Sequence, residues 1–346
     1  MLNSKKTIKS IIIIIFSILC LIIIAVLSLY RRDLSINELK EYLITDYSQI
    51  IPVTIHDLNS HKDITIDIHY YDSDNTNDQT IVLLHGMFSS LHTFIDAANL
   101  LKHEGYRVIL IDLPGHGLSG HFEDNMVSLS RSAAIVREIL NIESVNNCII
   151  GGNSMGGGVS WYFTSAYNNI DGFKVKALIL IDAVYPLAPD ENTGKRGGKS
   201  IIRLLKSNPF RNITYRMTPR LLIKYLLDSV YGTASKPDSK TIDRYYFMLR
   251  KTGNREALLN SNQDITCPAY IRGEELLESI AESKIPVLII WGKQDKWINV
   301  DLCRRFQETL NLDEKNIRIY ENSGHAPMEE EPARFYDDLL NFIKDL

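Results

Sequence analysis

The sequence predicts an α/β protein built on one mostly parallel sheet with helices on both faces, and two observations predict it. Strand-like apolar runs, each followed by a stretch with helical spacing, recur near residues 80–85, 107–112, 147–151 and 177–182. Two more strand-like runs, Pro286–Trp291 and Asn316–Tyr320, resume the pattern near the C-terminus. The interval of about a hundred residues between the two groups is too long for a loop, so it indicates an inserted helical cap.

These patterns divide the chain into five segments. They are an N-terminal membrane anchor (1–32), a connector (33–50), the first part of the α/β core (51–183), a helical cap (184–284) and the second part of the core (285–346). The core should open with an antiparallel pair, because residues 53–55 and 64–70 alternate polar and apolar side chains as half-exposed edge strands do. Apolar residues at helical spacing predict cap helices over 219–230, 239–251 and 273–281.

The N-terminal segment predicts a transmembrane helix. From Ile8 to Tyr30 the chain is almost wholly apolar and carries no charge after Lys9. About 20 such residues cross the ~30 Å of hydrocarbon in a bilayer. A cleaved signal peptide would have a shorter apolar core and a clear small-residue cleavage site, so we expect an uncleaved single-pass anchor. Basic residues flank both ends, and the short N-terminal tail favours a catalytic domain on the extracytoplasmic side.

Composition and cysteine spacing set further bounds. Hydrophobic residues make up 45% of the chain and charged residues 23%, which is ordinary for a globular protein with a sizeable core. The four cysteines, at positions 20, 148, 267 and 303, show no paired spacing, so a disulfide framework is not expected. The sequence contains neither C-x-x-C nor H-E-x-x-H, and we predict no metal site.

The predicted cap carries an unusual positive charge. Between Lys195 and Arg255 there are fifteen lysines and arginines against three acidic residues, although the whole chain has a net charge of −4. One interpretation is that these residues form solvated helix faces. The other is that the cap lies against an anionic membrane surface, where each basic residue adds ~1 kcal/mol of binding. Nucleic acid is not an expected partner, since a basic patch alone is non-specific.

A G-x-S-x-G pattern follows the strand near 147–151. Gly152 and Gly156 stand two residues before and two residues after Ser154. A serine on a sharp strand-to-helix turn takes strained backbone angles, and its neighbours must be very small so that strand and helix can approach closely. Such a turn lifts the hydroxyl clear of the sheet and leaves N–H groups of the helix start free to bind an anion. Ser154 is therefore the predicted nucleophile.

An acid and a histidine follow Ser154 in the chain, each after a later strand. Asp295 comes after the run Pro286–Trp291, and His325 comes after Asn316–Tyr320. The carboxyl ends of parallel strands meet at one edge of the sheet, where ligands bind. A serine hydroxyl needs an imidazole to take its proton, and the imidazole needs a carboxylate to fix its tautomer. Asp182, after the preceding strand, stays open as the alternative acid.

The loop after the strand near 80–85 supplies the predicted oxyanion hole. That strand ends in His85, Gly86 and Met87. In such an architecture, one N–H comes from the residue after the nucleophile and another from this loop, which points to the backbone of Met155 and Met87. Gly86 lets the chain approach the reacting carbonyl, and His85 is interpreted as structural.

The segment Gly115–Gly120 spells G-x-G-x-x-G after a strand, the nominal dinucleotide fingerprint. That interpretation requires a helix to open inside the motif. Pro114 precedes the motif, a polar loop follows it, and the next helix is expected only near Ser128. No nucleotide cofactor is therefore predicted.

The order serine, acid, histidine, with an oxyanion loop upstream, resembles the α/β-hydrolase superfamily. The resemblance runs from about Ile51 to the C-terminus and includes the stretches Asp112–Ser119, Trp291–Asp295 and Gly324–Pro332. Together with the anchor, the motif around Ser154 looks like those of membrane-bound monoacylglycerol lipases and carboxylesterases. The resemblance implies a serine hydrolase that cleaves monoacylglycerol-like or short acyl esters through an acyl-enzyme, with no cofactor.

Other activities share this constellation. A carbon–carbon hydrolase of ring-cleavage products and a cofactor-free perhydrolase use the same triad, but such enzymes are usually soluble, and the predicted anchor argues against them. An epoxide hydrolase would need a carboxylate where Ser154 stands. A non-catalytic binding module on the same fold would typically lack a member of the triad, whereas all three are present here.

Overall fold

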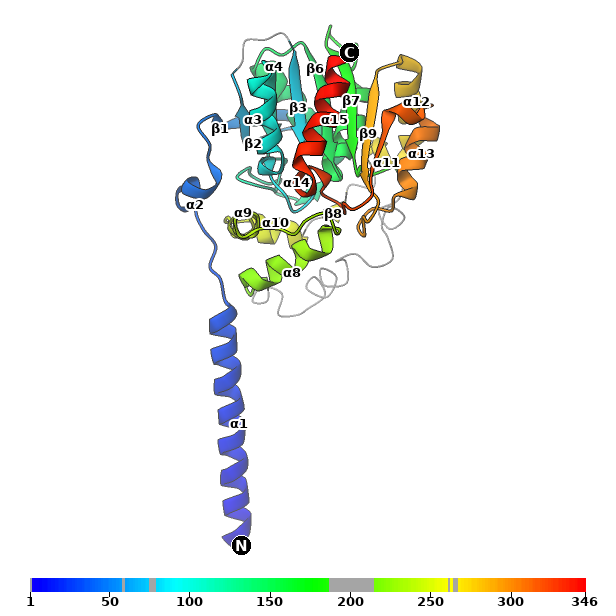
Figure 1. The fold of residues 1–346 in the computed structure, drawn as a ribbon. Helices are drawn as coiled ribbons and strands as arrows, with labels where there is room; N and C mark the ends of the chain where they lie inside the picture. Colours follow the sequence, from blue (N-terminus) through cyan, green and yellow to red (C-terminus); the bar gives the residue numbers. More distant parts are fainter. Residues whose placement is uncertain (1, 58–59, 75–78, 187–214, 261, 264–266) are drawn as a thin grey trace.

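The computed structural model describes residues 2–57, 60–74, 79–186, 215–260, 262–263 and 267–346. At its centre is an eight-stranded sheet in the order β1-β2-β4-β3-β6-β7-β9-β10 (Figure 1). The strands are β1 (Ser48–Asp57), β2 (Lys62–Asp72), β3 (Thr80–Leu84), β4 (Arg107–Ile111), β6 (Asn147–Asn153), β7 (Lys174–Ile181), β9 (Val287–Gly292) and β10 (Ile317–Tyr320).

The sheet is mostly parallel, as predicted. β2 pairs antiparallel with both β1 and β4, whereas every later neighbour, from β4–β3 to β9–β10, is parallel. The burial of β1 alternates over its second half, which agrees with a half-exposed edge strand. The strands β3, β6, β7, β9 and β10 therefore all end along the same side of the sheet. This side, formed by the carboxyl ends of the strands, is called the active edge.

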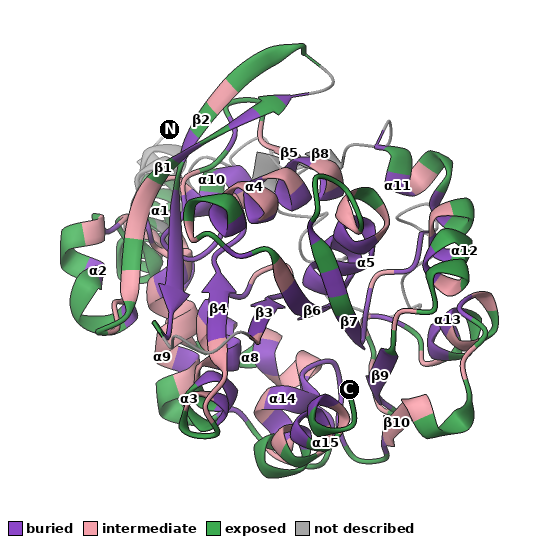
Figure 2. Ribbon diagram, turned by 90° about the horizontal axis from the view of Figure 1, so that it is seen from above, coloured by how far each residue is buried: buried purple, intermediate pink, exposed green. Residues whose placement is uncertain are grey.

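Helices cover both faces of the sheet, as Figure 2 shows from above. One face carries the 3₁₀ helix η1 (Leu91–Phe94), α3 (Ile95–His103), α14 (Pro327–Glu330) and α15 (Pro332–Lys344). The other face carries α4 (Leu129–Ile142), α5 (Met155–Tyr167), α12 (Gly273–Ser283) and α13 (Asp301–Thr309). A second 3₁₀ helix, η2 (Glu314–Asn316), leads into β10.

The strand β3 explains why the central strands are apolar throughout. Val82 and Leu84 pack into the cluster on the α4–α5 face, while Ile81 and Leu83 pack into the cluster on the α3–α15 face. Side chains alternate between the two faces of a strand, so a strand covered on both sides has no solvent-facing position. Each residue of β3 is accordingly buried.

The predicted cap range 184–284 contains helices in two different positions. α8 (Arg220–Val230), α9 (Ser239–Leu249) and α10 (Asn254–Asn260) lie beyond the active edge of the sheet (Figure 1). The short strand β8 (Asn262–Gln263) pairs with β5 (Met126–Val127), and α11 (Pro268–Ile271) leads into α12. In contrast, Leu277 and Ile280 of α12 belong to the hydrophobic cluster under the sheet. Residues 187–214, which include much of the predicted basic segment, lie outside the described residues.

The N-terminal helix α1 (Leu2–Leu29) extends away from the globular part of the molecule (Figure 1). Its segment Ile11–Leu29 is long and apolar enough to cross a membrane, a property that signal sequences share. Just beyond the helix, the Arg31 amide donates a hydrogen bond to the carbonyl of Arg216 (2.7 Å), which lies ahead of α8. The segment that follows α1 is thus bonded directly to the segment ahead of α8.

The predicted connector 33–50 contains the helix α2 (Ile36–Leu43) and the first residues of β1. Ser35 and Glu38 form a capping box at the start of α2. Asp33 forms ion pairs with Arg216 (3.2 Å) and with the buried side chain of Arg255. These contacts make the connector part of the folded domain rather than a free linker.

Candidate active site

Ser154 lies between the end of β6 and the start of α5, in a strained backbone conformation. Its φ is 55° and its ψ is −116°, a region that side chains rarely occupy. Its amide donates to the carbonyl of Ile181 (2.9 Å), and its carbonyl accepts from the amide of Val184 (3.0 Å). These bonds to the end of β7 hold the strained turn in place.

The two glycines of the motif allow this turn to form. A Cβ atom on Gly156 would lie 2.1 Å from the carbonyl oxygen of Leu84 in β3. A Cβ on Gly152 would lie 2.5 Å from the carbonyl carbon of Gly156. Any side chain at either position would therefore push strand and helix apart.

His325 and Asp295, predicted from separate loops, form a direct hydrogen bond. The Nδ1–H group of His325 donates to Oδ2 of Asp295 at 2.6 Å, and the carboxylate is fully buried. The other oxygen, Oδ1, accepts from the amides of Trp297 (2.6 Å) and Ile298 (3.0 Å). A hydrogen on Nδ1 leaves Nε2 of His325 able to accept a proton, which is the tautomer that a serine hydrolase needs.

The segments that carry Ser154 and His325 are bonded to each other. The side-chain amide of Asn153 donates to the carbonyl of His325 (3.0 Å) and to that of Ile181 (3.3 Å). The ring of Trp297 lies nearly parallel to the imidazole, with 6.4 Å between ring centroids. The structure therefore bonds His325 to Asp295 and ties the residue before Ser154 to the histidine loop, at the edge of the sheet where the sequence places all three residues.

Asp182, the alternative acid, lies beside Asp295, but the hydrogen bond from Nδ1 of His325 goes to Asp295. Its Oδ1 accepts from the amide of Gly292 (2.9 Å). Complete burial, followed by the charge of Asp295, raises the pKa of Asp182 well above its ordinary value. Donor atoms of these two aspartates and of His325 lie within 4.8 Å of one another, a spacing that could suit a metal ion. However, Nδ1 of His325 is already used in the bond to Asp295.

The predicted oxyanion groups also lie near Ser154. Met155 is the first residue of α5, where helix N–H groups have no partner within the helix. Met87 follows Gly86, and a Cβ on Gly86 would lie only 3.0 Å from the Cβ of Ser154. His85 braces this loop, because its Nδ1 donates to the carbonyl of Gly86 (2.7 Å) and its Nε2 accepts from the amide of Leu113 (3.0 Å). Burial lowers the pKa of His85, in keeping with a neutral structural ring.

Asp112 organises the loop after β4, a role that sequence reasoning missed. Its carboxylate accepts from the amides of Leu91 (2.7 Å) and Leu118 (2.8 Å) and from Nδ1 of His69 (2.6 Å). Burial opposes ionisation, but the interactions with His69 hold the pKa of Asp112 below its ordinary value. A Cβ on Gly117, whose φ is +50°, would lie 1.8 Å from Oδ2. The segment Asp112–Ser119 thus folds around the carboxylate of its first residue, Asp112.

Glu330 supports the histidine loop, a role that no sequence pattern indicates beyond the position of an acid shortly after His325. Its Oε1 accepts from the amide of Gly324 (2.8 Å), and its Oε2 accepts from the amide of Gly232 (2.7 Å) beyond the end of α8. Burial raises its pKa. The amide of His325 itself donates to the carbonyl of Val230 (2.8 Å). The segment after α8 is therefore bonded both to the backbone of His325 and to the side chain of Glu330.

The neighbouring Glu329 joins α9 of the cap to two loops of the core. It accepts hydrogen bonds from Thr93 (2.7 Å) and from the hydroxyl of Tyr245 (3.1 Å). The same hydroxyl lies 3.1 Å from Oγ of Ser89, in the oxyanion loop. Arg244 forms an ion pair with Glu329 as well. These partners come from distant parts of the chain, so no local sequence pattern reveals them.

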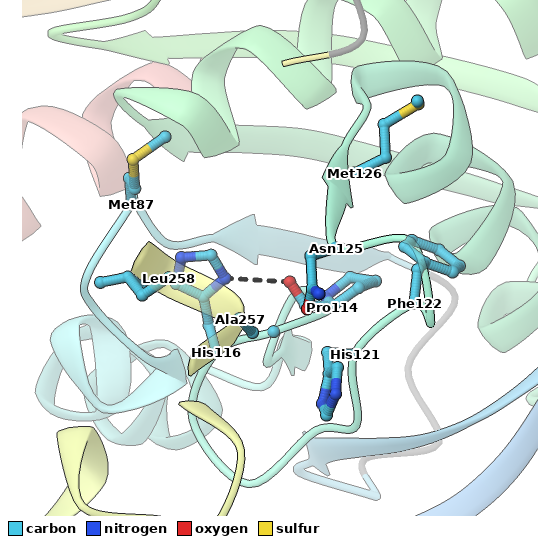
Figure 3. Close-up of a pocket in the computed structure, with 10 residues that line it drawn as sticks. Met87, Pro114, His116, His121, Phe122, Asn125, Met126, Ala257 and Leu258 are labelled. Atoms are coloured by element: carbon cyan, nitrogen blue, oxygen red, sulfur yellow. Dashed lines mark hydrogen bonds between the residues drawn. The ribbon is translucent and has the colours of Figure 1, made fainter. Parts of the chain in front are cut away.

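A small cavity of about 20 Å³ lies beside the oxyanion loop (Figure 3). Its walls come from that loop, from the loop after β4 and from α10. The lining residues are Met87, Pro114, Gly115, His116, His121, Phe122, Asn125, Met126, Ala257 and Leu258. One of these lining residues, Met87, is a predicted oxyanion residue.

Known proteins agree with this arrangement at two levels. In sequence, the chain is 26% identical over 296 residues to a 2-hydroxy-6-oxononadienedioate/2-hydroxy-6-oxononatrienedioate hydrolase of Burkholderia vietnamiensis, covering 80% of this chain and 91% of that protein. In structure, it is similar to an esterase of Thermogutta terrifontis (TM-score 0.64, 18% identity, 86% and 98% of the two chains covered). It is also similar to a bacterial membrane phospholipase A (TM-score 0.61, 21% identity, 86% of each chain covered).

At such low identities the two structures establish the fold alone. The family described as alpha/beta hydrolase fold, however, matches residues 79–332, which include Ser154, Asp295, His325 and the loop at Met87. With the sheet order, the strained serine and the bonded His–Asp pair in place, the chain belongs to the α/β-hydrolase family and is a hydrolase of that fold.

Proposed function

We propose that this chain is a membrane-anchored serine hydrolase that cleaves carboxylic esters. Ser154 attacks the ester carbonyl while His325 takes its proton and then donates it to the leaving alcohol. Asp295 orients the imidazole, and the amides of Met155 and Met87 bind the oxyanion. A water molecule activated by His325 then releases the acyl group.

The observation that carries this proposal is the hydrogen bond from His325 to Asp295 beside the strained serine turn. It supports a histidine with a free Nε2 at the place where a serine hydroxyl needs a base. The backbone strain at Ser154 supports the same assignment, because such strain persists where the surrounding structure enforces it and is concentrated at functional sites.

The proposed substrates are monoacylglycerol-like or short acyl esters at a membrane surface, on the extracytoplasmic side. Support comes from α1 and from the contacts that join Arg31 and Asp33 to the cap region. Helix α8 also exposes two large side chains to solvent, Leu221 (75% exposed) and Tyr225 (63% exposed), next to Lys224. Amphipathic side chains and basic residues of this kind suit a bilayer surface.

A panel of p-nitrophenyl esters of rising acyl length, together with monoacylglycerols, tests the proposed activity. We expect hydrolysis by the native chain and a loss of at least about a thousandfold in the Ser154→Ala variant. A fluorophosphonate probe should label the native protein and leave the variant unlabelled. Equal turnover by the two proteins would contradict the role of Ser154.

Carbon–carbon bond hydrolysis is the second candidate, because the matched relative from Burkholderia vietnamiensis is named for 2-hydroxy-6-oxononadienedioate. The same triad residues would serve that reaction. The native chain should therefore also be assayed with that dienedioate. Turnover of it, together with no turnover of any ester, would replace ester hydrolysis as the proposed activity.

A further inference from the structure

His116 forms part of the cavity beside the oxyanion loop, at the centre of the motif that follows β4. The side chain is almost completely buried, with 4% of the residue exposed. In Figure 3, one ring nitrogen forms a hydrogen bond with Pro114, and the other faces the side where Met87 and Leu258 lie. The cavity, at about 20 Å³, has room for one hydroxyl-sized group, and because Nε2 itself is closed to solvent, such a group reaches it after a small shift of the cavity wall.

The hydrogen-bond partner of Nδ1 determines which nitrogen of this ring carries the hydrogen. Nδ1 lies 3.0 Å from the carbonyl oxygen of Pro114, and a carbonyl can only accept, so Nδ1 is the donor. Burial and the neighbouring His85 ring, whose centroid is 5.3 Å away, lower the pKa of His116 to about 4. At neutral pH the ring is uncharged, and Nε2 carries a lone pair and no hydrogen.

Nε2 has no hydrogen-bond partner among the residues that the structure describes. A buried acceptor without a partner costs about 1–3 kcal/mol, and buried polar atoms in proteins are rarely left unpaired. The group that satisfies Nε2 must be a donor, such as a hydroxyl. A carbonyl or ester oxygen would face the lone pair with another lone pair.

The position of the cavity links this acceptor to the chemistry. Met87, whose amide is the proposed oxyanion donor, lines the same cavity as His116. Its neighbour Gly86 approaches Ser154 so closely that a Cβ there would lie 3.0 Å from the serine Cβ. The methionine side chains in the wall, Met87 and Met126, are flexible and can shift to admit a larger group.

We propose that Nε2 of His116 accepts a hydrogen bond from a free hydroxyl in the alcohol half of the substrate, so that the site selects monoacyl esters of polyols over esters of simple alcohols. This inference rests on the proposed ester hydrolysis and names its substrate class.

The test compares three soluble esters with the full-length protein: 1-butyrylglycerol, propyl butyrate and propyl 3-hydroxybutyrate. We expect kcat/KM to favour 1-butyrylglycerol over propyl butyrate by about tenfold, since a site built around a hydroxyl rejects the analogue that lacks it. In His116→Asn the side-chain amide still donates to Pro114 but nothing replaces Nε2, and the preference should fall to within about twofold of unity.

Two further variants protect the result from folding artefacts. His116→Phe keeps a ring of similar size without an acceptor and should also lose the preference. His116→Gln can bring an amide oxygen to the position of Nε2 and should regain part of it. A preference that survives in both Asn and Phe variants, equal losses on all three esters, or dependence on His116 only for the hydroxyl of propyl 3-hydroxybutyrate would each overturn the inference.

A binding measurement separates this inference from the proposed activity. In the Ser154→Ala background, calorimetry should show 1-O-butylglycerol binding about tenfold more tightly than butyl propyl ether, and His116→Asn should abolish the difference. If no ester is hydrolysed but this difference appears, the activity is wrong and the hydroxyl site stands. If esters are hydrolysed and the two ethers bind equally, the hydroxyl site is wrong.

Discussion

At the scale of the single residue, the two carboxyl groups near His325 have different surroundings. Asp295 accepts the imidazole hydrogen and two backbone amides, as an ionised carboxylate does. Asp182 is enclosed beside it, with a raised pKa caused first by burial and then by the charge of Asp295. The raised pKa of Asp182 favours its neutral form, which lessens the repulsion between the two neighbouring carboxyl groups.

Matched substitutions separate the two aspartates. Asp295→Asn should lower kcat by roughly a thousandfold to ten-thousandfold, because the amide favours the wrong tautomer of His325. Asp182→Asn should keep kcat within about tenfold, since an amide resembles the protonated acid and can still accept from Gly292. Steady-state ester hydrolysis measures both, with circular dichroism as the folding control. The reverse order of effects would make Asp182 the orienting acid.

Lys251 predicts a pH dependence of stability. Its Nζ donates to the carbonyl of Ser119 (2.6 Å) inside the protein, and burial lowers its pKa from 10.5 to about 8. Between these values the unfolded chain binds more protons than the folded one, so this residue's contribution to stability is lowest below pH 8 and rises toward pH 10.5. The rise should total about 3 kcal/mol.

Chemical denaturation at pH 7, 8, 9 and 10 measures this effect. Relative to Lys251→Met, the native protein should gain stability steadily with pH. The exposed Lys240→Met provides the control, and its difference from the native protein should stay flat. If the stability difference between the native protein and Lys251→Met is also independent of pH, folding does not lower the pKa of Lys251.

The proposed triad could be located in the sequence because each of its residues follows a strand that the apolar runs reveal. Asp112, Glu329 and Glu330 could not be assigned roles in the same way. Several of their partners, such as Leu91, Gly232 and Tyr245, come from remote segments, and such contacts leave no spacing pattern in the chain. The unpartnered Nε2 of His116 could likewise be identified only from the structure, which shows the residues around the ring.

At the scale of the element, the turn from β6 into α5 depends on how closely that helix approaches β3. Gly156 faces the carbonyl of Leu84, a backbone atom that cannot move aside. Gly158, one half-turn further along the same helix, faces side-chain atoms of Leu129 and Val184 at 3.4 Å. The two glycines therefore offer a matched pair with different consequences.

Gly156→Ala should destabilise the fold by about 3 kcal/mol through overpacking and abolish labelling of Ser154. Gly158→Ala should change stability by no more than about 1 kcal/mol, because the gain in helix propensity offsets a tight side-chain contact. Urea denaturation and fluorophosphonate labelling distinguish them. A stable, fully labelled Gly156→Ala would show that the close approach is not needed.

Most elements were predictable because their periodicity follows directly from burial. β3 is buried on both faces and therefore apolar throughout, while β1 and β2 show the alternation of an edge. The placement of α12 was not predictable in this way. An apolar helix face specifies that it is covered but not by what, and α12 packs beneath the sheet rather than beside α8.

At the scale of the whole molecule, α8 and the proposed anchor lie on the same side of the sheet (Figure 1). A protein lacking residues 1–30 keeps the contacts of Arg31 and Asp33. We expect it still to bind anionic vesicles better than neutral ones, with binding that weakens as salt is added. Equal binding to both vesicle types would argue against a membrane-facing cap.

The apolar part of that surface can be tested in the same truncated protein. Leu221→Ser combined with Tyr225→Ser should weaken binding to both vesicle types by about tenfold or more, because two exposed side chains are lost from the interface. Ile170→Ser removes another exposed apolar side chain (50% exposed), ahead of β7 at the opposite end of the strands, and should leave binding unchanged. Vesicle flotation measures all three proteins.

The backbone bond between His325 and Val230 bears on the timing of turnover. If α8 swings outward to admit the substrate, this bond and the one between Gly232 and Glu330 must break together. The backbone of His325 then loses this support while α8 is in its outward position. Substrate entry and bond cleavage must therefore alternate. A compound that holds α8 in the outward position would inhibit turnover without contacting the nucleophile.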